Sequence, residues 1–188
     1  MDTQPNDPSA AIGPRSRPVS AILVGGFIVG ILDLVYAIGV YSPKHPILIP
    51  QTIASGVLGA KAYSGGGATA VLGVVLHFFI AFVAAAIYYL VSRRVSFLIR
   101  RAFVSGLIYG AVVYLVMHWV VLPLSAVHPS HMAALLKLAE FVEHWFFVGL
   151  PIAMSVRHSS ICPDSNCVLC VRGLCWPGKA RAKAYAYR

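Results

Sequence analysis

The chain has 188 residues, of which 59% are hydrophobic and only 11% are charged. Soluble domains carry about 25% charged residues, so this composition excludes an ordinary soluble domain. The net charge of +9 does not indicate nucleic-acid binding, because the basic residues flank apolar segments instead of forming one patch with interleaved aromatics. We therefore expect an integral membrane protein whose main partner is the lipid bilayer, with no nucleic-acid partner.

Residues 1–18 are polar and contain four prolines, which predicts a disordered N-terminus. The first apolar segment follows at 19–41, with Asp33 as its one charge. A signal-peptide core is only about 7–15 residues long, so this longer segment is expected to be a retained transmembrane span. Residues 51–63 in the next connection are partly apolar but too few to cross a bilayer, which takes about 20 residues. They predict a short interfacial or re-entrant helix.

Three further apolar segments lie at about 68–91, 102–124 and 135–156. Each is long enough to span the hydrocarbon core, and Pro151 is expected to kink the last one. The predicted fold is therefore all-α and integral to the membrane. It has four transmembrane helices running up-down-up-down through 19–157, followed by a basic, cysteine-containing tail at 158–188.

Lysine and arginine are distributed unequally between the two sides of these spans. Twelve fall in the N-terminus, the turn between spans two and three, and the tail, whereas only Lys44, Lys61 and Lys137 fall on the other side. Cytoplasmic loops carry the excess of positive residues. The count predicts that both termini are cytoplasmic.

Ionisable side chains interrupt all four spans: Asp33, His77, His118, Glu140, Glu143 and His144. At 1.5 Å per residue, Asp33 lies about 12 Å and His77 about 13 Å from the outer ends of their spans. All six positions fall in the outer half of the bundle. Ionisable groups at such depth usually face a bundle interior or a water-filled cavity. We predict one polar layer to which every span contributes.

Glycines mark the faces on which the helices are expected to pack. Small residues spaced four apart let helix backbones approach closely in membranes. The candidates are Gly26, Gly30, Gly73, Gly106 and Gly110. The spacing of Gly26, Gly30 and Pro43 repeats at Gly106, Gly110 and Pro123, which leaves open a parallel duplication of two hairpins.

The residue types in the polar layer are compatible with several chemistries. Imidazole and carboxylate ligands suit a hard or borderline divalent metal, and paired imidazoles on facing helices could hold a haem. Histidines and carboxylates could equally conduct protons. Alternatively, Glu140 could pair with His144 and Asp33 with a histidine, simply to hold the helices together at about 0.6 kcal/mol per bond. The sequence identifies no cofactor.

The tail contains four closely spaced cysteines: Cys162, Cys167, Cys170 and Cys175. Cysteine thiolates bind zinc or iron–sulfur clusters. However, zinc knuckles have a longer segment between their two cysteine pairs than the two residues found here. These cysteines are secondary candidates for a metal site.

The segments SGVLG, GGGATAVLGVVLHFFIAF, YYLVSRR, GLIYGAVVYLVMHWVVLPLS and VGLPIAM resemble a family of small bacterial four-helix inner-membrane proteins, with a more distant likeness to YagU-like proteins. The resemblance covers roughly 19–157 and excludes the cysteine tail. It implies a bacterial cytoplasmic membrane protein, and it supplies no catalytic or binding residues.

Three hypotheses for function follow. The first is a small transport or ion- or proton-handling protein that uses the polar layer. The second is a structural or interaction subunit, in a homo-oligomer or with another membrane protein, whose glycine faces bind partner helices. The third is a membrane metal- or haem-binding redox protein. No nucleophile elbow, Walker loop or His-Glu-x-x-His motif is present in the sequence, so we assign no catalytic residues.

Overall fold

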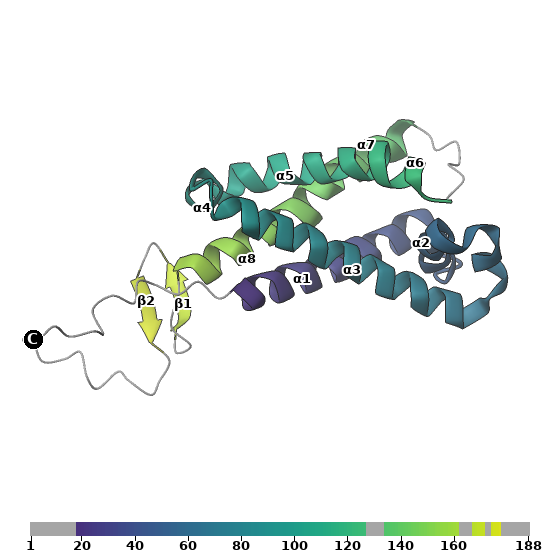
Figure 1. The fold of residues 1–188 in the computed structure, drawn as a ribbon, viewed down its shortest axis with the longest axis horizontal. Coiled ribbons are helices and arrows are strands. Elements are labelled where there is room, and N and C mark those ends of the chain that lie inside the picture. The colour runs from purple at the N-terminus through teal and green to yellow at the C-terminus, as the bar shows by residue number, and fades with distance from the viewer. Residues whose placement is uncertain (1–17, 127–133, 162–166, 172–173, 178–188) are drawn as a thin grey trace, which may run out of the picture.

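The computed structural model describes residues 18–126, 134–161, 167–171 and 174–177. From residue 18 to 161 the described chain is predominantly helical (Figure 1). The elements are α1 (Pro18–Tyr41), α2 (Leu48–Leu58), the 3₁₀ helix η2 (Gly59–Ser64), α3 (Gly66–Ser92), α4 (Phe97–Arg100), α5 (Ala102–Val116), the π-helical segment η3 (Met117–Val121), α6 (Leu122–Leu124), α7 (Ala134–Glu143), the π-helical segment η4 (His144–Gly149) and α8 (Leu150–Ile161).

Three helices are long and apolar enough to cross a membrane: Val19–Tyr41, Gly66–Ser92 and Ala102–Leu124. These helices match the first three predicted spans in position, and they are consistent with a membrane protein. Large apolar side chains cover the outer surface of these helices, with Val71 65%, Phe79 63% and Leu90 64% exposed. A soluble monomer does not expose apolar surface on this scale, whereas lipid tails satisfy it.

The fourth predicted span, 135–156, is not one regular helix. The chain from 134 to 161 forms α7, η4 and α8 in succession, and the π-helical turns of η4 end two residues before Pro151. Proline lacks a backbone N–H, and its ring clashes with the carbonyl of the residue four positions earlier. A wider π turn just before the proline relieves that clash, so the expected kink is a change of helix type.

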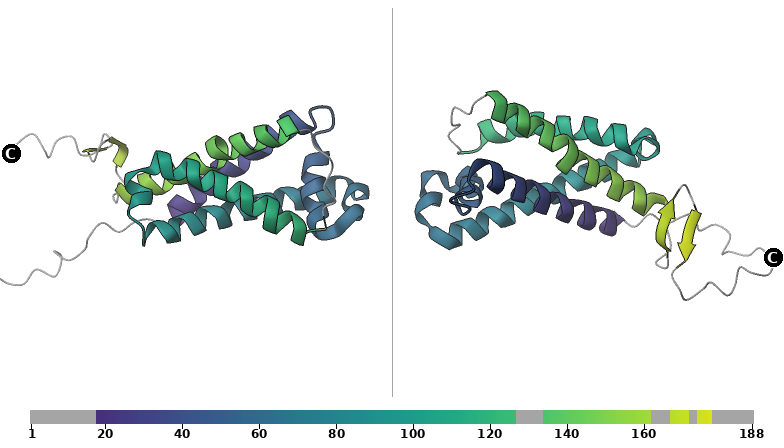
Figure 2. Two further views of the ribbon diagram at one scale, coloured as in Figure 1. Left: turned by 90° about the horizontal axis from the view of Figure 1, so that it is seen from above. Right: turned by 180° about the vertical axis from the view of Figure 1, so that it is seen from behind.

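The last helical run crosses between the other helices. η4 and α8 contact both α1 and α5, while α3 packs against α1 and α2. In Figures 1 and 2, α3 and α5 meet at α4 and separate towards α2 and α6, while α1 packs against α3. The chain is thus arranged as two helical hairpins joined most closely at one end.

Glycines allow the close approaches within each hairpin. A Cβ added to Gly26 would overlap the ring of Phe82, and one added to Gly30 would overlap the ring of Phe78. In the second hairpin, a Cβ at Gly110 would overlap the carbonyl oxygen of His144. These glycine faces therefore pack against helices of the same chain.

The end near α4 contains most of the buried apolar core and a hydrogen-bonded network. Tyr88 is 1% exposed, and its hydroxyl lies 2.8 Å from Oγ of Ser105 and donates to the carbonyl of Leu98 at 3.1 Å. Tyr109 on α5 donates to the carbonyl of Ala84 on α3 at 2.7 Å. Satisfied polar groups of this kind fix the relative position of helices in a medium that offers no water.

The predicted short helix in the first connection is present as α2 followed by η2. Gln51 is 4% exposed and donates from Nε2 to the carbonyl of Gly66 at 3.0 Å, which joins α2 to the start of α3. Gly66 itself has φ +58°, a left-handed conformation that glycine adopts without strain. The sequence Gly65–Gly67 therefore ends η2 and turns the chain into α3.

The described part of the tail departs from the all-α prediction. Strands β1 (Cys167–Val171) and β2 (Leu174–Pro177) form an antiparallel pair, with the backbone of Cys170 opposite that of Cys175. Cys162 lies outside the described residues. The cysteine metal site stays a prediction.

Candidate functional site

The first contact in the predicted polar layer joins α1 to α3. Nε2 of His77 lies 3.0 Å from the carbonyl oxygen of Gly30 and 3.7 Å from Oδ2 of Asp33. A carbonyl oxygen can only accept a hydrogen bond, so Nε2 of His77 carries the proton and donates it to Gly30. This N–H also faces the carboxylate of Asp33, which lies one helical turn after Gly30. His77 therefore orients Asp33 within the first hairpin.

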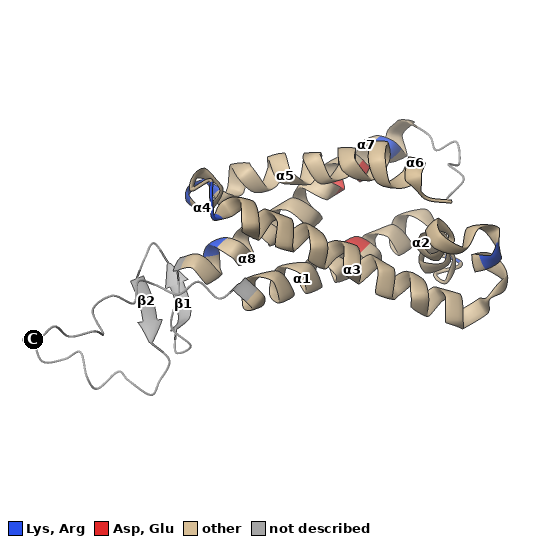
Figure 3. Ribbon diagram, in the orientation of Figure 1, with Lys and Arg blue, Asp and Glu red and all other residues tan. Residues whose placement is uncertain are grey.

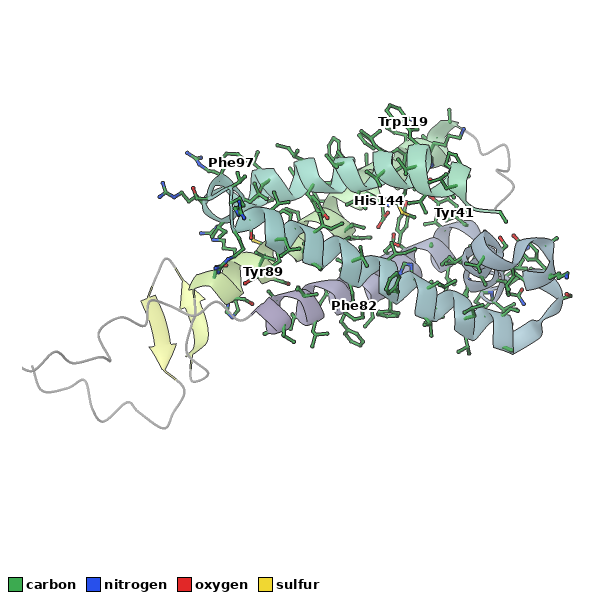
Figure 4. The ribbon with its side chains drawn as sticks, viewed as in Figure 1. Tyr41, Phe82, Tyr89, Phe97, Trp119 and His144 are labelled. Carbon is green, nitrogen blue, oxygen red and sulfur yellow. The ribbon has the colours of Figure 1, made fainter. Side chains whose placement is uncertain are left out.

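Asp33, Glu143 and His144 form a compact group, which we call the trio. One oxygen from each carboxylate and one ring nitrogen all lie within 4.8 Å of one another. Glu143 is 5% exposed, and its Oε2 lies 2.8 Å from Nδ1 of His144. The trio brings α1 together with the junction of α7 and η4, so it joins the two hairpins in the half of the bundle away from α4. Figure 4 shows His144 between the two helical layers.

The hydrogen bonds of His144 define its tautomer. Nδ1 lies 2.9 Å from the backbone carbonyl oxygen of Glu140. Because that oxygen can only accept, Nδ1 carries a proton that it shares between Glu140 and the carboxylate of Glu143. In the neutral ring Nε2 then has a free lone pair. His144 is thus held by its own helix in a defined orientation.

Two carboxyl groups at this separation cannot both remain charged in an apolar environment without a cation between them. Like charges that share a site repel, and each buried charge has also lost its hydration. Among the residues that the structure describes, Oε1 of Glu143 is buried and has no hydrogen-bond partner. An unsatisfied carboxylate oxygen costs free energy in a membrane interior, where no water replaces the missing donor. The arrangement is therefore suited to hold a positive ion.

His118 and Glu140 form a second pair beside the trio. Nε2 of His118 lies 3.7 Å from Oε2 of Glu140, so this pair joins η3 to α7. The side-chain pair of Glu140 with His144 that i,i+4 spacing suggested is wrong, since only the carbonyl of Glu140 contacts His144. Glu140 instead turns to a histidine on the neighbouring helix. The six predicted residues thus form two groups. One contains the trio and His77, which contacts Asp33, and the other is the His118–Glu140 pair.

Two of the three histidines of the layer lie on π-helical segments. His118 is the second residue of η3, and His144 is the first residue of η4. From each of these histidines the sequence reads His-Trp, then apolar residues, then Leu-Pro. The two prolines are Pro123 and Pro151, each two residues after the π-helical segment. Single π turns within α-helices occur frequently at functional sites. This shared sequence motif could have indicated the two π-helical segments. Helical periodicity alone does not detect them.

Aromatic side chains complete the surroundings of both histidine groups, and the sequence reasoning missed them. Tyr114 stacks on His118 with ring centroids 4.1 Å apart and meets His144 edge-on at 5.5 Å. Tyr36 on α1 packs edge-on against Phe147 of η4 at 5.7 Å. The i,i+4 spacing of Tyr114 and His118 could have shown the first contact. Aromatic rings thus pack directly against both His118 and His144.

Comparison with protein families, with curated proteins and with solved structures finds no match for this chain. The resemblance to the family of small four-helix inner-membrane proteins stays a prediction. The functional argument therefore rests on the residues themselves.

Proposed function

We propose that the protein is a small transport or ion-handling protein of a bacterial cytoplasmic membrane. It crosses the membrane four times, has both termini in the cytoplasm, and holds a cation at the trio in the outer half of the bundle. The buried carboxylate of Glu143, placed beside that of Asp33 at the junction of the two hairpins, carries this proposal.

The lengths and charges of the helices support the proposed topology. The run from 134 to 161 is about 42 Å long at 1.5 Å per residue, enough to serve as a fourth span across a core of about 30 Å. Arginines cluster around α4 and on α8 at the end from which the tail leaves, and single lysines lie at the other end (Figure 3). Because cytoplasmic loops carry the excess of positive residues, this distribution supports a topology with α4 inside.

The unsatisfied oxygen of Glu143 favours a cation site over a purely structural role. A bond that only holds helices together needs complementary donors and acceptors, as in the Tyr88–Ser105 contact. The trio instead sets two acidic groups against one imidazole. Nor do Gly26, Gly30, Gly106 and Gly110 favour a partner-binding surface, because they pack against helices of their own chain.

Flux measurements on the purified protein in liposomes test this proposal. Vesicles loaded with a pH-sensitive dye report protons, and vesicles loaded with a metal-sensitive dye report divalent cations. We expect flux of at least one of these ions, reduced at least tenfold in Glu143→Gln. Tyr88→Phe, which alters the opposite end of the bundle, is the matched control and should retain flux. Absence of flux of either ion from well-folded protein would overturn the proposal.

A further inference from the structure

We propose that the trio binds one divalent first-row transition-metal ion of the zinc and manganese class. This inference rests on the proposed function, in that it names the cation that the same site holds. Asp33 and Glu143 would each supply a carboxylate oxygen, and His144 would supply Nε2, the ring nitrogen whose lone pair is free.

The charge of the site selects the charge of the ion. Two ionised carboxylates contribute −2, and the neutral imidazole contributes nothing. A divalent cation neutralises this charge completely, whereas a monovalent cation leaves one negative charge in an apolar interior. Glu143, whose side chain is only 2% exposed, cannot obtain the missing compensation from bulk water.

The ligand types select the class of metal. Calcium and magnesium prefer all-oxygen sites, and magnesium keeps most of its water. Copper(I) prefers thiolate and thioether ligands, which the trio does not contain. A mixed set of carboxylate oxygen and imidazole nitrogen suits zinc, manganese, iron(II) and cobalt. Three protein ligands also leave a coordination position open, as exchangeable and catalytic sites require.

Neighbouring groups already orient these ligands. The N–H of His77 faces Asp33 while donating to Gly30, and Nδ1–H of His144 donates to the carbonyl of Glu140. Metal sites typically have such a second layer of hydrogen bonds, which fixes the tautomer and direction of each ligand. His77 is therefore a positioning residue, and His77→Ala should weaken metal binding less than the loss of a ligand.

Metal binding to the full-length protein in lipid nanodiscs tests the inference. The probes are Zn²⁺, followed by equilibrium dialysis, and Co²⁺, followed by its visible d–d absorption. The starting protein carries serine in place of all four tail cysteines, so that only the bundle can bind. We expect one metal per chain, with affinity at least tenfold lower in Glu143→Gln and in Asp33→Asn.

Glu140→Gln is the matched control, since it removes a carboxylate one turn from Glu143 but outside the trio. Its affinity should stay within threefold of the parent. Should Glu143→Gln fail to fold, Asp33→Asn decides the question alone. The inference is overturned if the native protein binds metal and the protein without tail cysteines does not. It is also overturned if folded Asp33→Asn binds metal with unchanged affinity.

The two proposals fail in distinguishable ways. Stoichiometric metal binding without flux of any ion would retain the metal site and remove the transport role. Proton flux without metal binding would retain ion handling and overturn the metal assignment. Loss of the Co²⁺ absorption in Glu143→Gln would place the ion at the trio directly, independently of any flux.

Discussion

The backbone of Gly110 on α5 lies directly against the backbone of His144 at the start of η4. A Cβ at residue 110 would overlap the carbonyl oxygen of His144 and come within 2.8 Å of the Cα of Trp145. No flexible side chain can move to make room there, because the obstructing atoms belong to the main chain. The position of the trio therefore depends on a residue that contributes no functional group.

Gly110→Ala is expected to displace η4 and to destabilise the protein by about 1–3 kcal/mol, the usual cost of overpacking. Thermal unfolding in detergent measures the effect. Gly39→Ala is the control, because a Cβ at that glycine meets nothing within 4 Å. Equal unfolding temperatures for the two variants would contradict the close approach of α5 and η4.

Tyr109→Phe should destabilise the protein by about 1 kcal/mol, because it leaves the carbonyl of Ala84 without its 2.7 Å hydrogen bond. This bond joins α5 to α3. Tyr63→Phe removes only an exposed 3.3 Å hydrogen bond to Oγ1 of Thr52, which competes with water, and should have little effect. Denaturant unfolding of the two variants gives their free energies of unfolding. A Tyr63→Phe variant less stable than Tyr109→Phe would contradict this prediction.

The His118–Glu140 pair offers a measure of side-chain attraction outside the trio, although Oε2 of Glu140 and Nδ1 of His118 are also buried without a hydrogen-bond partner among the described residues. A double-mutant cycle with His118→Ala and Glu140→Gln should give a coupling energy of about 0.6 kcal/mol, the average for such bonds in membranes. Both single variants should still bind Co²⁺. A coupling near zero would show that the 3.7 Å contact adds nothing to stability.

Pro151→Ala tests whether the proline maintains η4. Alanine restores a backbone donor and removes the ring clash, so the helix can return to regular α geometry and rotate His144 away from Asp33. We expect unchanged or higher thermal stability together with at least tenfold weaker Co²⁺ binding. Pro123→Ala alters the equivalent position after η3, which carries no trio ligand, and should leave binding within threefold.

The proposed topology predicts opposite labelling of two exposed serines. In protein whose tail cysteines are serine, Ser64→Cys at the end of η2 should react with a membrane-impermeant maleimide added to intact cells. Ser96→Cys beside α4 should react only after the membrane is opened. Both side chains are exposed in the structure, so accessibility within the protein does not distinguish them. Reaction of Ser96→Cys in intact cells would contradict the proposed orientation and indicate the opposite one.

The sequence predicts the helices more accurately than it predicts how their side chains pair. The third span, 102–124, has the predicted ends, because apolar composition and length alone define it. Helical periodicity placed Glu140, Glu143 and His144 on one face. In the structure Glu140 contacts His118 and Glu143 contacts His144 in the trio, since helices on two sides supply different partners.

The π-helical segment η4 begins at His144, so it changes the helix geometry after these residues and leaves Glu140 and Glu143 on the regular helix α7. A 3.6-residue period carried through Gly149 to Pro151 assumes a regular helix, whereas η4 has wider turns and changes the direction of residues on either side of it. The contacts between segments, such as Gly110 against His144, depend on tertiary packing that a single segment does not encode. The faint repeat between the two hairpins was nevertheless informative, because Gly30 and Gly110 both lie beside histidine-bearing helices.

The three large side chains that are almost completely buried, Tyr88, Ile152 and Val156, belong to the half of the described bundle nearest α4. Dense packing at this end leaves little free volume through which a hydrated ion could pass. In the proposed topology this packed end faces the cytoplasm and would act as the barrier to passive leakage. Ion flux through the protein would then require this end to open, so that an ion held at the trio is released inward.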